Sequence, residues 1–229
     1  PPTAAALADH ELALAESATH VAPVERALIQ SLRRRYTLPQ PEDRAPLDRA
    51  YADAMRAVWR QFPRDADVGA FFAEAMMDLR PWDQWTPKGQ PQAGTDEIIA
   101  TLDAVLQLDL QHPFANHLYV HALEASPHPE RAIAAADRLL TLQPGLAHNV
   151  HMPPHIYIRV GRWQDAVASN IKAVAADHAY RAVAGPPQGF LPTYIAHNHH
   201  MLAYAAMMTG QSRLALRQMH DLVAELPPE

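Results

Sequence analysis

The chain contains no cysteine, which excludes disulfide bonds, thiolate metal ligands and a cysteine nucleophile. Glycine is scarce, with 8 residues in 229, and no apolar run reaches the ~18–20 residues that a membrane-spanning helix needs. Lys and Arg number 19 against 25 Asp and Glu, and the resulting net charge of −6 argues against nucleic acid as a partner. We therefore expect a globular protein that binds neither nucleic acid nor membrane.

Several catalytic and targeting signals are also absent. The chain has no P-loop, no dinucleotide-binding glycine motif, no Gly-x-Ser-x-Gly elbow and no His-Glu-x-x-His motif. Kinase, NAD-dependent and serine-triad chemistry are therefore poor candidates. Because no secretory signal is recognisable, we expect a cytoplasmic location, with the periplasm as the alternative, since a chain without cysteine suits either compartment.

The feature that stands out is histidine at a regular spacing. His117 and His121 form a His-x-x-x-His pair, and His151 and His155 form a second pair 34 residues later. After an insertion, a shift of 49 residues carries His148 and His151 onto the positions of a third set, His197 and His200. Histidines scattered through a core would have no reason to keep this phase.

A period of 34 residues is the length of the tetratricopeptide repeat, a pair of antiparallel helices. In the best copy we predict a first helix that ends near Val160, a turn at 161–163 and a second helix over 164–176. The preceding copy turns at 127–129, and the last turns at Gly210 and ends at Pro227. The sequence predicts an all-α, tetratricopeptide-like superhelical solenoid, organised as a single domain over 1–229.

The clear repeats occupy 113–229, whereas 1–112 are less regular. Here we predict helices at 3–17, 23–36, 46–61, 66–79 and 96–110. A loop rich in Pro, Gly and Trp covers 80–95, and an insertion at 178–192 is predicted to form a second long loop. Loops of this length in a repeat array are often functional, and both are expected to cover the groove.

Imidazoles that project from the first helices of successive repeats are expected to meet in the concave groove and hold a transition metal. Copper is the preferred ion, followed by iron or zinc. The main candidate ligands are His117, His121, His151, His155 and His200, followed by His148 and His197. Because Pro153 and Pro154 interrupt the middle set, its helix should kink or begin at Pro153, with His148 and His151 on an extended segment.

Three further residues are candidates for catalysis. Glu124 lies one turn beyond His121 and could ligate the metal, orient an imidazole or move a proton; the alternative is an ion pair with Arg131 or Arg159. Glu74 could act as a ligand or general base, or belong to a solvated face with Asp78. Arg159 could hold an anionic substrate, although surface and ion-pair roles are commoner for arginine.

Four segments together resemble a group of bacterial tetratricopeptide-repeat proteins with histidine-rich repeats: RPWDQWTPKGQP, HPFANHLYVHALEASPHPERA, HMPPHIYIRVGRWQDA and YIAHNHH. The resemblance implies the helical repeat fold and a shared histidine site, and it implies no reaction.

We therefore favour a metalloenzyme that acts on a small molecule in the groove, by oxidation with copper or iron or by hydrolysis with zinc. An oxidoreductase is preferred to a hydrolase. The alternatives are an adaptor that binds a peptide or protein partner in the groove, and a protein for metal storage or delivery.

Overall fold

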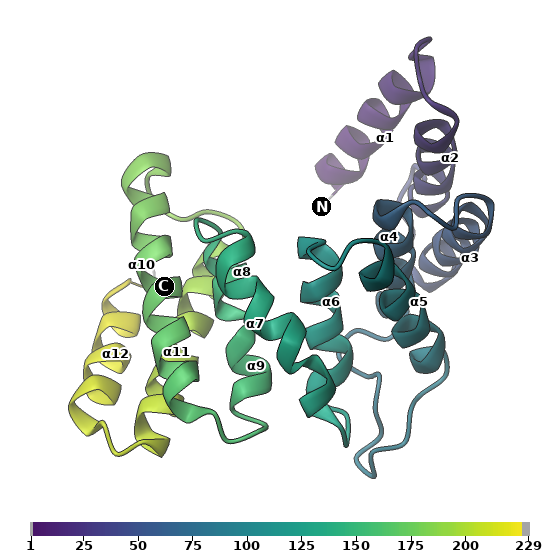
Figure 1. The fold of residues 1–229 in the computed structure, drawn as a ribbon. Helices are drawn as coiled ribbons and strands as arrows, with labels where there is room; N and C mark the ends of the chain where they lie inside the picture. Colours follow the sequence, from purple (N-terminus) through teal and green to yellow (C-terminus); the bar gives the residue numbers. More distant parts are fainter. Residues whose placement is uncertain (1, 226–229) are drawn as a thin grey trace. The chain divides into compact units, whose positions relative to one another are not determined.

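The computed structural model describes residues 2–225, and within them the regular structure is helical (Figure 1). The predicted end of the last repeat at Pro227 lies outside the described residues. The helices divide into two compact units, Pro1–Leu118 and Tyr119–Glu229, and the boundary falls inside one helix, α6 (Pro113–Glu124). The prediction of one domain over 1–229 stays a prediction.

The first unit is a succession of helices in which each packs on the next along the chain. They are α1 (Pro2–Ser17), α2 (Pro23–Leu32), α3 (Ala45–Gln61), α4 (Ala66–Met77) and α5 (Thr95–Leu108), with a short 3-10 turn at Arg33–Arg35. These bounds agree closely with the predicted ones. Local signals explain the starts: the backbone N–H of Ala22 donates to Glu25, and Asp65 accepts from the N–H of Val68.

The second unit continues with a 3-10 turn at Pro129–Ala132 and the helices α7 (Ile133–Leu142), α8 (Ala147–His151), α9 (Pro153–Tyr157), α10 (Trp163–Ala184), α11 (Leu191–Met208) and α12 (Ser212–Glu225). Helices α10, α11 and α12 lie side by side, coloured green to yellow in Figure 1. Gly161 and Gly210 adopt φ values of 80° and 72° in the turns that separate paired helices, as the repeat predicts.

The predicted loop at 178–192 is wrong, because α10 continues to Ala184 and only a short connection precedes α11 at Leu191. The stretch after Gly161 contains many alanines and neither glycine nor proline until Gly185, so nothing in it stops the helix. Gly185 then ends the helix with φ 83°, and its N–H donates to the carbonyl of Arg181. The insertion is therefore mainly a longer helix.

The prolines in the middle repeat interrupt a helix without unfolding it. Helix α9 begins at Pro153, as one of the two predictions states, but His148 and His151 lie on the helical turn α8 and not on an extended segment. Met152, between the two helices, keeps helical dihedrals of −56° and −40°. The two ligand candidates therefore keep a helical spacing.

No helix within residues 2–225 combines the length and apolar character needed to cross a membrane.

Candidate metal centre

Three imidazoles meet inside the second unit, supplied by α8, α9 and α11. The Nε2 atoms of His151 and His155 lie 3.0 Å apart, and the Nε2 atoms of His155 and His197 lie 3.3 Å apart. His151 is fully buried, and the other two are partly buried. One ring nitrogen from each lies within 4.8 Å of the others, an arrangement that could hold a metal ion.

The opposite nitrogen of His151 is fixed by Asn170 on α10. The side-chain N–H of Asn170 donates to the carbonyl of Ala166, so its oxygen faces Nδ1 of His151 at 2.7 Å. An amide oxygen only accepts, and Nδ1 must therefore carry the proton. Burial, reinforced by the neighbouring His155 and His197, lowers the pKa of His151 well below its ordinary value. The imidazole is thus neutral, with a lone pair on Nε2.

Glu124, at the end of α6, fixes two imidazoles with its two oxygens. Oε2 lies 2.5 Å from Nδ1 of His155, and Oε1 lies 2.8 Å from Nδ1 of His121. Burial raises the pKa of Glu124, but the hydrogen bonds from both histidines outweigh this effect and hold the pKa below its usual range. The group is therefore a carboxylate that accepts from both rings, which is how an acidic residue orients metal-binding histidines.

These hydrogen bonds direct lone pairs toward one another. Nε2 of His151 has no proton, and Nε2 of a neutral His155 has none either, yet the two atoms are 3.0 Å apart. A proton on Nε2 of His155 could form a hydrogen bond to His151 or to His197, but not to both. A cation between the rings would serve all three nitrogens at once.

The separations also suit a metal. Three nitrogens bound to one tetrahedral ion at about 2.0–2.1 Å lie about 3.3–3.4 Å from each other. The observed contacts of 3.0 and 3.3 Å are close to this spacing. Ligand atoms of His121, Glu124 and His155 also lie within 4.8 Å of one another. However, the hydrogen bonds of Glu124 satisfy that second set without an ion.

His197 completes the group from α11. Burial is the largest influence on it and lowers its pKa to about 4, and the charges of His155 and His200 act in the same direction. A neutral imidazole is the form that binds metals. His197 therefore stays competent to ligate over most of the mildly acidic range.

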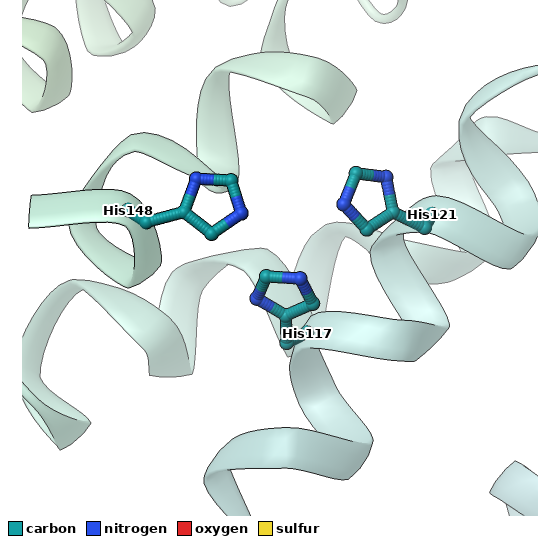
Figure 2. Close-up of side chains that lie close together, drawn as sticks. All are labelled: His117, His121 and His148. Carbon is teal, nitrogen blue, oxygen red and sulfur yellow. The ribbon is translucent and has the colours of Figure 1, made fainter. Parts of the chain in front are cut away.

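Two more histidines border this group. A ring nitrogen of His121 lies within 4.8 Å of one of His148, and Figure 2 shows the two rings facing each other from α6 and α8. The ring of His148 stacks on His151, with centroids 6.0 Å apart, and its centroid lies 4.6 Å from that of Tyr194. Of the candidates, His117 lies one helical turn before His121 on α6.

The backbone of α8 is supported from α10 as well. Pro154 has no N–H, so the carbonyl of Val150 lacks its usual helical donor. The hydroxyl of Ser169 donates to that carbonyl at 2.5 Å. Ser169 and Asn170 are adjacent, so one dipeptide holds both the interrupted backbone and the ring of His151.

Other candidate residues lie elsewhere. His200 is exposed on α11 and is absent from the ring nitrogens that converge within residues 2–225. Arg159 is exposed in the turn after α9. Glu74 lies on α4 of the first unit, where burial and Asp78 raise its pKa while Arg35 opposes them. Glu124 binds two imidazoles, which is the orienting role considered for it.

Two further histidines are buried outside this group. The Nδ1 atom of His112 accepts from the N–H of Ala115, and its Nε2 contacts Asp67 at 3.0 Å. His199, which lies out of phase with the repeat, is 1% exposed and bonded to Gln218.

Sequence reasoning did not single out Asn170 or Ser169. A signal for Asn170 exists, because it follows Ala166 by one helical turn and precedes Ala173 and Val174 on the buried side of α10. A polar residue at a core position needs a partner.

The fold and these paired helices define an all-α, tetratricopeptide-like superhelical protein. Solved structures of MamA have this fold: one MamA structure matches with a TM-score of 0.58 at 13% identity, covering 81% of this chain and 96% of that one. MamA from Desulfovibrio magneticus RS-1, residues 41 to the end, matches with a TM-score of 0.60 at 12% identity, covering 88% and 92%. No protein-family model and no curated protein matches the chain. At this identity the likeness concerns the fold alone.

Proposed function

We propose that this protein binds a transition metal ion through Nε2 of His151, His155 and His197. The observation that carries the proposal is the convergence of these three nitrogens while the Nδ1 atoms of His151 and His155 donate to Asn170 and Glu124. The hydrogen bonds select the Nδ1-protonated tautomer of His151 and His155, which leaves Nε2 of each ring to bind a metal ion.

The donor set narrows the choice of metal. Imidazole ligands suit copper, zinc, iron and nickel better than magnesium or calcium, and the chain has no thiolate to offer. We propose copper first, followed by iron or zinc. Iron more often has a carboxylate among its ligands, and here the carboxylate of Glu124 is engaged by two N–H groups.

We further propose a catalytic role for the centre, with a small molecule as substrate. Three protein ligands leave a coordination position for substrate or water, as in catalytic sites. Copper or iron would supply oxidation, and zinc would supply hydrolysis. Storage or delivery favours exposed, labile ions, whereas His151 is fully buried. Glu124 would act by positioning His155 and His121.

We also propose that the chain is a member of the histidine-rich bacterial tetratricopeptide group. It is supported by the pairs His117/His121 and His151/His155, which lie 34 residues apart. A protein or peptide partner is compatible with the fold class, but the buried imidazoles favour the metal.

The test is the metal content of the full chain, purified without a nickel column and dialysed against copper, zinc or iron. Plasma mass spectrometry should show a tightly bound equivalent in the wild type that is lost in the double variant His155→Gln/His197→Gln. His220→Gln removes an exposed histidine of the same unit and should retain it. If folded wild-type protein and the double variant bind each ion equally, this centre does not exist.

A further inference from the structure

A second group of potential ligands lies in the same unit, on another side of α11 from the site described above. His178 on α10, His199 on α11 and Glu225 at the end of α12 present ligand atoms within 4.8 Å of one another. Oε1 of Glu225 is hydrogen-bonded to Nε2 of His178 at 3.0 Å and lies 3.7 Å from Nε2 of His199, so a metal ion bound by all three groups would replace that hydrogen bond. Three helices thus place two imidazoles around one carboxylate oxygen.

The tautomer of His199 is set by Gln218. The side-chain N–H of Gln218 donates to Asp221 at 3.3 Å, and its oxygen faces Nδ1 of His199 at 2.8 Å. Nδ1 therefore carries a proton, and Nε2 is the ring atom that faces Glu225. The 3.7 Å separation exceeds that of a hydrogen bond.

The two oxygens of Glu225 have different neighbours. Oε2 binds the guanidinium of Arg181, which leaves Oε1 for His178 and His199. The contacts of 3.0 and 3.7 Å lie on either side of the spacing, about 3.3–3.4 Å, of ligands around one tetrahedral ion. A small shift of Oε1 of Glu225 away from His178 and toward His199 would equalise the two contacts.

One side of this group opens onto a cavity of about 600 Å³. Its lining includes His178, Arg181 and Glu225, together with Pro186 and Pro187 from the turn after α10. An ion bound here would therefore keep positions open to water or to a small ligand. The guanidinium of Arg181 would favour a ligand with negative charge.

We propose that His178, His199 and Glu225 form a second metal site, of the two-histidine, one-carboxylate type, for zinc or iron(II). It is separate from the first site: His197 and His199 are two positions apart on α11, so they project about 200° apart around the helix. A carboxylate oxygen is a harder ligand than an imidazole nitrogen, so the ligand set of this second site is harder than that of the first. This inference does not rest on the proposed function.

The test is zinc and cobalt(II) binding to the full chain, with stoichiometry from equilibrium dialysis and coordination from the cobalt absorption spectrum. The wild type should bind two equivalents. The variant His178→Gln/Glu225→Gln should lose one, or bind it at least tenfold more weakly, while His155→Gln/His197→Gln should lose the other. His220→Gln is the control on α12, and circular dichroism checks that each variant is folded.

The outcomes separate the two sites. If the wild type binds one equivalent of metal, and only the variant His178→Gln/Glu225→Gln loses it, the result would support this second site. The same result would overturn the first site. Folded His178/Glu225 protein with the stoichiometry, affinity and cobalt spectrum of the wild type would overturn this second site, whatever happens at the first.

Discussion

Nδ1 of His155 lies 2.5 Å from Oε2 of Glu124, although the residues are 31 positions apart and belong to α9 and α6. The other oxygen of the same carboxylate accepts from His121. Glu124 therefore links two histidine-bearing helices. The orientation of the ring of His155 therefore depends on a hydrogen bond to the preceding repeat.

Glu124→Gln should weaken metal binding by about 10–100-fold, the usual effect of losing a group that orients a ligand. A glutamine offers one oxygen and cannot accept from both imidazoles as a carboxylate does. The measurement is the dissociation constant of copper and zinc from competition with a chelator. Glu130→Gln provides the control, because Glu130 pairs with the exposed His128. Unchanged affinity in the Glu124 variant would contradict the orienting role.

Asn170→Ala should destabilise the metal-free protein by about 1–3 kcal/mol, because it leaves the buried N–H of His151 without an acceptor. It should also weaken metal binding by roughly tenfold, since the tautomer is no longer selected. Urea unfolding and metal competition measure the two effects. Lys172→Ala, at an exposed position of α10, should change neither. Normal metal affinity in a folded Asn170 variant would argue against His151 as a ligand.

The stability of the metal-free protein should fall as the pH drops from about 6.5, the ordinary histidine value, toward about 4. Burial lowers the pKa values of His151 and His197, the latter to about 4, so the unfolded chain takes up protons in this window that the folded chain does not. We expect a loss on the order of 2 kcal/mol, measured by urea unfolding at several pH values after chelation. His197→Gln should show a shallower pH dependence, and an equal slope would refute this origin.

Gly69→Ala should destabilise the first unit. A Cβ at this position of α4 would lie 2.4 Å from Cγ2 of Val105 and 2.9 Å from Cζ3 of Trp59. Alanine improves helix propensity by about 1 kcal/mol, but overpacking costs about 1–3 kcal/mol, and because the added Cβ would overlap backbone-anchored side chains closely the net effect should be a loss of up to about 2 kcal/mol. Gly145→Ala meets no atom within 4 Å and should be neutral by comparison. Thermal unfolding distinguishes them.

The helices could be predicted from sequence because their signals are local. Apolar periodicity, together with a proline in the first turn of α3, places α3 and α4 within two residues of their observed bounds. The end of α10 could not be predicted from the repeat period, because the alanine-rich stretch to Ala184 continues the helix past the length of a repeat. Local helix propensity prevailed over periodicity at that position.

The candidate site was predictable only in part. Repeat phase predicts that His117, His121, His151, His155 and His200 should meet, followed by His148 and His197. In the structure the ring nitrogens of His151, His155 and His197 converge. Phase does not distinguish His200 from His197, because the rotation of α11 is set by packing on α10 and α12. The pairing of Glu124 with His155 depends on contacts between α6 and α9, which no local pattern encodes.

Helix α10 contributes no ligand to the first site, yet its adjacent Ser169 and Asn170 hold the backbone of α8 and the proton of His151. In the proposed metal site, the properties of His151 as a ligand would therefore depend on a helix that contributes no ligand itself. Because Ser169 compensates for the donor that Pro154 lacks, a change there would alter folding and metal affinity together. Natural variation in this dipeptide should accordingly accompany variation in Pro153 and Pro154.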